Sequence, residues 1–195
     1  PISRDSIPYK SSYSHKNEKA TPGYYQVFLE NHNVNVELTT SKRTAYHKYT
    51  FKEGDTQSVV INLGFAINWD KSIETFLKVE DEHTISGYRY STGWAKNQKV
   101  FFVAKFSKPI VNYKLSADGN TTDKDLVKGI KTSTQLFFDG AKNKELLAKV
   151  ALSSVSVENA KDNLDAKEET FETTKSEAET LWNSALSQIV VETPT

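Results

Sequence analysis

The residue types that most often bind metals or transfer protons in enzymes are few and scattered in this chain. Its four histidines lie far apart, and no two of them have the i, i+4 spacing of a helical zinc-binding pair. They are His15, His32, His47 and His83. We expect these histidines to be exposed or hydrogen-bonded residues of strands and turns, and we assign no metal site to them.

Two acidic clusters are the other candidates for metal or acid–base chemistry. One is the Glu-Asp-Glu run at 80–82, and the other combines Asp118, Asp123 and Asp125. Calcium prefers several oxygen ligands around a tight loop, and neither cluster has the spacing of an EF-hand. Glycoside hydrolysis needs two carboxyl groups facing one another across a pocket, and no such pair stands out. We therefore expect these carboxylates to be solvated surface charges.

The stretch "ISGYRYSTGWA" (85–95) places glycines beside several aromatic residues and an arginine. Aromatic rings with adjacent polar groups suit contacts with a sugar or a protein partner. Tyr88, Arg89 and Trp94 are therefore candidates for a substrate-side or interface surface. The same pattern also suits a glycine-punctuated turn whose Tyr88, Tyr90 and Trp94 pack over the end of a sheet. Both interpretations stay open at this point.

Composition excludes several other functions. Lysine plus arginine and aspartate plus glutamate both number 25, and this balance argues against a nucleic-acid partner. No apolar run approaches the roughly 20 residues that cross a membrane. Cysteine is absent, which excludes disulfides and thiolate sites. The chain also lacks phosphate-binding, dinucleotide-binding and Gly-x-Ser-x-Gly motifs. Methionine is absent even at position 1, so we expect a piece of a longer protein.

The elements that must position these residues are mostly strands. Alternation of apolar and polar residues, with β-branched and aromatic enrichment, predicts strands at 24–30, 34–38, 43–51, 58–65, 99–106, 110–115, 134–138 and 145–153. Residues 73–79 fit a helix or a strand, and the polar segment 116–131 is typical of a loop. We predict a mainly β fold, an antiparallel β-sandwich over 23–155, preceded by an extended lead-in arm at 1–22.

Beyond position 155 the pattern predicts a pair of α-helices within 156–190. Ser156 suits a helix N-cap, and Glu158 suits the positive end of the helix dipole. After a break near 168–170, a second apolar stripe begins at Phe171 and includes Leu181 and Trp182. Phe171, Leu181 and Trp182 are the expected docking residues of this helix. Exposed helix faces of this kind also make a homodimer possible.

Several long segments resemble the N-terminal domain of glycoside hydrolase family 92, the calcium-dependent exo-acting α-mannosidases. The matching positions run from Ser14 to Phe51, from Gly87 to the strand "KVFFVAKFSKP", and through "ALSSVSVENAKDNL" (151–164) and "LWNSALSQIVV" (181–191). The first segment contains Ser14, His15, Glu18, Ala20, Pro22, Gly23, Tyr24, Tyr25, Glu37, Leu38, Thr39, Arg43, His47, Tyr49 and Phe51.

The resemblance implies a sandwich of the supersandwich type, whose helical connector leads to an (α/α) toroid catalytic domain outside this chain. It implies a parent enzyme that removes terminal α-linked mannose, with α-1,2 linkages expected, by an inverting mechanism. It also implies carbohydrate (mannose-containing glycans) as the partner, calcium held mostly by the toroid, and a periplasmic or secreted location. No catalytic residue is expected in this chain, which should be inactive alone.

Two other functions fit the same residues. An autonomous carbohydrate-binding module would need an aromatic platform on a solvated face. A structural or adhesion domain would need neither a sugar site nor a catalytic partner.

Overall fold

The computed structural model describes residues 9–54, 56–141, 143–166 and 169–191. Within these ranges a short 3₁₀ turn, η2 (His15–Asn17), precedes the strands. The strands are β1 (Glu18–Thr21), β2 (Tyr24–Leu29), β3 (Val34–Thr40), β4 (Thr44–Thr50), β5 (Gln57–Asn62), β6 (Lys71–Val79), β7 (Thr84–Thr92), β8 (Gln98–Phe106), β9 (Ile110–Ala117), β10 (Asn120–Thr122), β11 (Leu126–Gly129), β12 (Thr132–Phe138) and β13 (Glu145–Ser153). Two helices follow, α1 (Val157–Asp165) and α2 (Phe171–Leu186).

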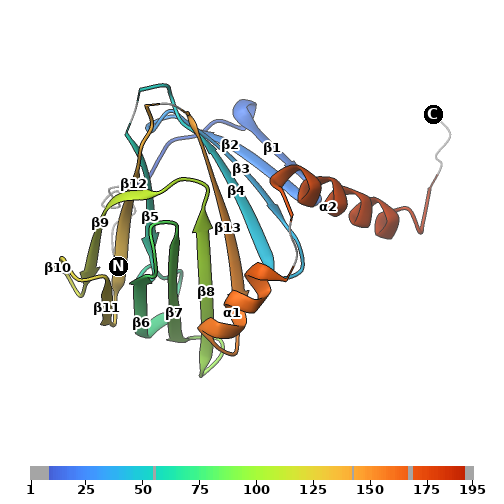
Figure 1. Ribbon diagram of the computed structural model, residues 1–195. Coiled ribbons are helices and arrows are strands. Elements are labelled where there is room, and N and C mark those ends of the chain that lie inside the picture. The colour runs from blue at the N-terminus through green and yellow to red at the C-terminus, as the bar shows by residue number, and fades with distance from the viewer. Residues whose placement is uncertain (1–8, 55, 142, 167–168, 192–195) are drawn as a thin grey trace.

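The strands form two facing antiparallel sheets (Figure 1). The larger has the order β1-β2-β3-β4-β13-β8-β7-β6-β11, and the smaller has the order β10-β9-β12-β5. Their facing sides enclose one apolar core, in which Leu77 and Ile85 of the larger sheet and Leu115 and Leu136 of the smaller are fully buried. The predicted antiparallel sandwich with two C-terminal helices is confirmed.

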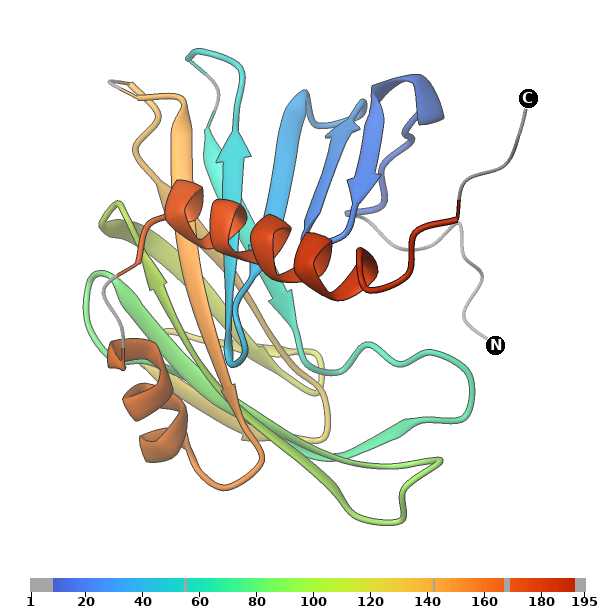
Figure 2. The same ribbon diagram turned by 90° about the vertical axis from the view of Figure 1, so that its right-hand side faces the viewer.

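Both helices cover the face of the larger sheet that is turned away from the core. Ser156 caps α1, and its side chain accepts a hydrogen bond from the Asn159 amide at 3.0 Å, as the sequence predicted. Ala160 and Leu164 of α1 then pack on Val103 and Ala151. Helix α2 lies across β2, β3 and β4 (Figure 2).

Two segments differ from the expectation. Residues 84–92 are strand β7 rather than a turn, because Gly87 allows close strand packing instead of a bend; a Cβ there would lie 2.3 Å from the Phe76 carbonyl oxygen. The expected loop at 116–131 contains β10 and β11, and Val127 of β11 is buried against the core. A few apolar residues without alternation in a polar segment are a weak strand signal, so the prediction missed these strands.

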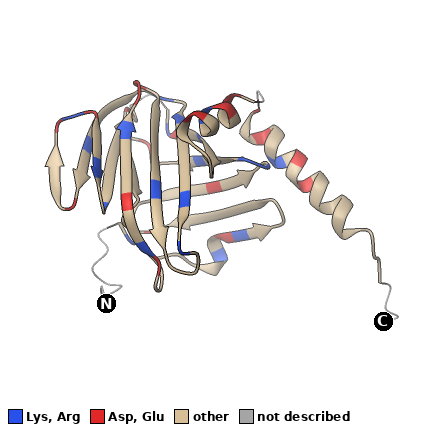
Figure 3. Ribbon diagram, turned by 90° about the horizontal axis from the view of Figure 1, so that it is seen from below, with Lys and Arg blue, Asp and Glu red and all other residues tan. Residues whose placement is uncertain are grey.

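Three further segments had been predicted in less detail. The ambiguous segment 73–79 lies in strand β6. The lead-in arm contains η2 and the edge strand β1, which pairs with β2, while residues 1–8 lie outside the described residues. The first residue of the break predicted at 168–170 also lies outside the described residues. Acidic and basic positions are scattered among the strands and both helices (Figure 3).

Candidate functional site

Two neighbouring loops at one end of the sandwich expose a group of large apolar side chains. The loop 63–70 joins β5 to β6, and the tip 93–97 joins β7 to β8 (Figure 2). We call Phe65, Ile67, Trp69 and Trp94 the aromatic rim. Trp69 is 60% exposed and Trp94 is 92% exposed. Exposed aromatic residues gathered on adjacent loops are typical of a binding surface rather than of chance exposure.

Glycine brings the two loops into contact. A Cβ atom on Gly93 would lie 3.0 Å from Cα of Asp70, so the tip of the hairpin packs directly against the end of the other loop. The Gly93 amide donates to the Ala95 carbonyl at 3.0 Å, which closes the tip just after Trp94. The position of Trp94 is therefore coupled to that of the loop carrying Trp69.

Arg89 of β7 holds the first loop from beneath. Its guanidinium donates to the carbonyl oxygens of Leu63 and Phe65, the latter at 2.7 Å, and forms an ion pair with Asp70. Only 17% of the Arg89 side chain is exposed. Arg89 therefore lies behind the rim and does not form part of its solvent-facing surface.

Tyr88 lies on the other face of β7, because side chains alternate along a strand. Its ring stacks between Phe76 and Tyr90, with ring centroids 5.3 and 4.6 Å away. The Tyr88 hydroxyl donates to Glu74 at 2.8 Å, and burial together with this carboxylate raises the pKa of Tyr88. The Tyr88 ring is thus packed against other rings. The structure separates Tyr88, Arg89 and Trp94 into three different environments.

The three expected docking residues of α2 also differ in environment. Phe171 is 4% exposed and packs with Tyr24 and Tyr46 of the larger sheet. The Lys48 ammonium lies 4.5 Å from the centre of the Phe171 ring. Leu181 and Trp182 are 66% and 50% exposed. The described part of the chain therefore buries the first turn of α2 and leaves much of its C-terminal half uncovered.

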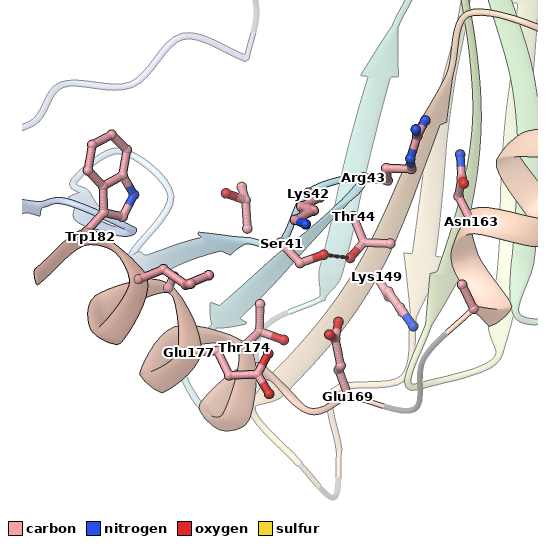
Figure 4. A pocket seen from close by; sticks show the side chains of 14 residues that line it. Ser41, Lys42, Arg43, Thr44, Lys149, Asn163, Glu169, Thr174, Glu177 and Trp182 are labelled. Atoms are coloured by element: carbon pink, nitrogen blue, oxygen red, sulfur yellow. Dashed lines mark hydrogen bonds between the residues drawn. The ribbon is translucent and has the colours of Figure 1, made fainter. Parts of the chain in front are cut away.

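A groove of about 510 Å³ lies between α2, the end of α1 and the turn joining β3 to β4 (Figure 4). Its lining includes Trp182, Glu169 and Glu177. Inverting glycosidases need one carboxyl group sufficiently buried to keep its proton, and Glu177 is exposed. Thr174 lies on the same helix as Glu177. Its hydroxyl is buried and has no hydrogen-bond partner among the described residues. Glu169, the other carboxylate of the groove, is half-buried.

The described residues contain no group of three or more His, Cys, Asp or Glu side chains that could hold a metal ion. Three of the histidines make local hydrogen bonds instead: His15 to Glu18 at 2.5 Å, His47 to Tyr49 at 2.8 Å and His83 to the Phe106 carbonyl at 2.9 Å. Burial lowers the pKa of His47. Of the helices that the structure describes, none has the length and apolarity needed to span a membrane.

The acidic clusters are likewise used within the fold. Asp118 accepts hydrogen bonds from the amides of Ile130 and Lys131 at 3.1 and 2.8 Å, which shapes the turn before β12. Asp81 accepts from the His83 amide at 2.7 Å in the turn between β6 and β7. These contacts account for two members of the clusters as turn residues.

Phe65, Ile67 and Trp69 were not predicted as site residues. The segment "GFAINWD" (64–70) does carry a signal, since two aromatic residues follow a glycine. Its first two residues were predicted as the end of the strand 58–65, whereas β5 ends at Asn62. Only the fold shows that this segment lies against the tip carrying Trp94.

The fold and the rim define a β-sandwich domain whose larger sheet carries two helices on its outer face. The family model described as the glycosyl hydrolase family 92 N-terminal domain matches residues 2–153, and the chain belongs to this family. The resemblance in the sequence is thereby confirmed. No curated protein matches the chain.

Solved structures agree with this assignment. A family GH92 α-mannosidase from Bacteroides thetaiotaomicron in complex with mannoimidazole is 27% identical, with a TM-score of 0.88, and the match covers 95% of this chain and 26% of that one. A family GH92 inverting mannosidase from Bacteroides thetaiotaomicron VPI-5482 is 25% identical, with a TM-score of 0.82, covering 95% and 25%. A bacterial glucoamylase complexed with acarbose shares the fold alone, at 11% identity and a TM-score of 0.56, covering 91% and 28%. The chain thus spans about a quarter of the length of these structures.

Proposed function

We propose that this chain is the non-catalytic N-terminal sandwich of a longer, inverting α-mannosidase, and that the aromatic rim forms one wall of its active-site cleft. The substrate would be a glycan with a terminal α-1,2-linked mannose. Family membership supports the class of enzyme, and the similarity to structures of mannosidases supports the class of sugar. The observation that carries the role of the rim is the pair of exposed tryptophans on two touching loops.

An indole ring suits a sugar because pyranose rings present apolar C–H faces between hydroxyl groups. Stacking against such a face removes apolar area from water, while the hydroxyls remain free for polar partners. Trp94 is almost fully exposed, so its ring is accessible to a ligand before any other domain is considered. Tyr88 and Tyr90 are less suitable, since they stack on each other.

The reacting groups would belong to the rest of the enzyme. The resemblance to glycoside hydrolase family 92 implies a calcium ion. Calcium does not fit the described residues, because they offer no cluster of three or more His, Cys, Asp or Glu side chains. On the basis of the family resemblance, we propose that calcium and the acid–base carboxylates belong to the downstream catalytic domain. On the same basis we place the enzyme in the periplasm or outside the cell. The uncovered face of α2, which includes Leu181 and Trp182, would dock on that domain.

The proposal is tested by comparing this chain with the longer enzyme on an aryl α-mannoside and an α-1,2-linked mannobiose. We expect no turnover by the chain alone. In the longer enzyme, Trp94→Ala should lower kcat/KM by about tenfold, equivalent to ~1.4 kcal/mol of transition-state binding. Val155→Ala is the control, since Val155 is also exposed (72%) but lies outside the rim. Turnover by the isolated chain, or an unchanged kcat/KM for Trp94→Ala, would contradict the proposal.

The rim also supports a second candidate, an autonomous carbohydrate-binding module. Two exposed tryptophans on one surface could bind a mannose oligosaccharide without any catalytic domain. Isothermal titration of this chain with millimolar mannose oligosaccharides separates the two functions. Saturable binding that Trp94→Ala removes would favour the autonomous binding module. A flat titration would favour the role of the rim as one wall of the active-site cleft.

A further inference from the structure

Arg89 contacts both ends of the loop that carries most of the rim. Its acceptors are the carbonyls of Leu63 and Phe65 at the start of loop 63–70 and the carboxylate of Asp70 at its end. A guanidinium can serve these acceptors together, because it presents five N–H donors in a planar fork and stays charged at all relevant pH values. A lysine ammonium at this position would have neither the reach nor the fork geometry.

The loop has few other anchors of its own. The Leu63 amide donates to the Thr132 carbonyl at 2.9 Å, and the Gly64 amide donates to the Asn62 side chain at 2.9 Å. Both contacts lie at the start of the loop. Toward its end, the Asp70 amide lies 3.4 Å from the Ile67 carbonyl, which is a weak hydrogen bond within the loop. The ion pair of Asp70 with Arg89 therefore ties this end of the loop to β7, next to the point where Lys71 pairs with Thr92.

Asp70 is also the residue against which the second loop packs, since Gly93 approaches its Cα closely. Arg89, Asp70 and Gly93 thus form a continuous connection from the sheet to Trp69 on one side and Trp94 on the other. Trp69 directly precedes Asp70 in the sequence, and Trp94 directly follows Gly93. A displacement of Asp70 would move both rings.

We infer that Arg89 is a positioning residue that fixes Trp69 and Trp94 relative to one another, so that the aromatic rim is preorganised before any ligand binds. Its value for catalysis rests on the proposed role of the rim in the mannosidase cleft. Preorganisation of a binding surface improves affinity because the conformational entropy of the loops is lost before the ligand arrives. Arg89 would act in this way without touching the sugar.

The inference is tested first in this chain by nuclear magnetic resonance. The chain has three tryptophans, and the third, Trp182 on α2, serves as an internal control. In Arg89→Ala we expect the indole N–H signals of Trp69 and Trp94 to shift while that of Trp182 does not. Backbone order parameters of the two loops should fall from about 0.85 toward 0.6 or below. Arg89→Lys should behave like Arg89→Ala, because the charge is kept but the fork is lost.

Two further variants keep the test decisive. Asp70→Asn removes the ion pair without emptying space beneath the loop, and it should loosen both loops even if Arg89→Ala folds poorly. Lys128→Met is the control, since it breaks an ion pair with Glu74 at 2.9 Å that lies outside the rim. Unchanged loop order in both Asp70→Asn and Arg89→Lys would overturn the inference.

In the longer enzyme, Arg89→Lys should raise KM by about tenfold with little change in kcat, since a preorganised surface acts on binding. Loosened loops with unchanged kinetics would leave Arg89 as the positioning residue of the rim and would instead contradict the role of the rim in the cleft. Failure of the inference and failure of the proposed function are thereby distinguishable.

Discussion

At the scale of single residues, Gly87 determines how closely β7 can approach its neighbours. A Cβ at this position would lie 2.3 Å from the Phe76 carbonyl oxygen and 2.7 Å from the Phe102 ring, both inside van der Waals contact. The carbonyl belongs to the backbone of β6 and cannot move without disturbing the sheet. Gly87→Ala should therefore lower the free energy of unfolding by about 1–3 kcal/mol, as overpacking does elsewhere.

Denaturant unfolding followed by circular dichroism measures this change. Thr92→Ala is a suitable control, because Thr92 ends the same strand and is half-buried. If Gly87→Ala were as stable as the control, the close approach of the strands would not be a constraint on the sequence.

Glu80 makes the stability of the fold depend on pH. Burial alone would raise its pKa, but hydrogen bonds from Lys78 and Ser86, each 2.6 Å long, outweigh burial and lower the pKa below the ordinary 4.5. Because this pKa is lower in the folded chain than in the unfolded chain, the contribution of Glu80 is complete above about pH 4.5 and is lost as the pH falls through the folded pKa.

Glu80→Gln should therefore destabilise the protein at pH 7. The stability of this variant should also fall less steeply than that of the wild type as the pH drops below about 4.5. Melting temperatures of the two proteins across pH 3–7 test this expectation. The matched variant is Glu82→Gln in the same turn, whose side chain is 74% exposed. Parallel pH curves for the wild type and Glu80→Gln would show that the carboxylate makes no such contribution.

The candidate site illustrates what residues alone reveal. Trp94 stands out in the sequence because it follows glycine and lies among other aromatic residues, and the structure places it at 92% exposure. Arg89 stands out because it lies between two tyrosines, yet its partners lie 19 to 26 positions away along the chain. Local pattern suggests that a residue matters, but the partners that give it a role come from folding.

At the scale of elements, the two helices are attached to the sheet in different ways. Leu164 of α1 is 5% exposed and closes a small cluster with Val103 and Ala151. Leu181 of α2 is 66% exposed. The same substitution at both positions compares the two helices directly.

Leu164→Ala should lower the free energy of unfolding by about 2–5 kcal/mol, because it empties a closed apolar cluster. Leu181→Ala should change it by less than about 0.5 kcal/mol in this chain. Chemical denaturation of both variants provides the measurement. A large loss in Leu181→Ala would mean that α2 is packed along its whole length, contrary to its exposure.

Most elements could be predicted from the sequence, for a definite physical reason. Strands β2, β3 and β4 have one face in the core and one partly solvated, so their apolar residues alternate and the pattern is visible. Helix α1 has a recognisable N-cap in Ser156. Strand β7 was missed because Gly87, normally a turn residue, is there for close packing rather than for bending.

At the scale of the whole molecule, the order of strands could not be read from the sequence. Strand β13 lies between β4 and β8, pairing Val150 with both Ala45 and Ala104. These pairs are separated by 46 to 105 positions, and nothing in a local pattern specifies them. The last strand in the chain thereby joins the early strands β1–β4 to the strands β6–β8 that carry the rim, so the sandwich is complete only when 145–153 has been added.

Besides the aromatic rim, the described part of the molecule exposes a second group of apolar side chains. From Leu181 onward, α2 and the residues after it expose Trp182, Leu186, Ile189, Val190 and Val191. Leu186 is 59% and Ile189 is 81% exposed. Several exposed apolar residues in one short segment either face another domain or promote association.

We expect this chain to self-associate in a concentration-dependent manner through that surface, because association removes the apolar area from water. The double variant Leu186→Lys with Ile189→Lys should remain monomeric in sedimentation velocity, since charge opposes burial and a lysine near a helix C-terminus leaves the helix itself intact. Val155→Lys, which adds a charge at an exposed apolar residue before α1, should associate like the wild type. In the longer enzyme the same double variant should instead weaken the attachment of the sandwich to the rest of the chain, which limited proteolysis would detect as faster release of this domain. A monomeric wild-type chain, together with unchanged proteolysis of the longer variant, would show that the exposed stripe of α2 has no partner of either kind.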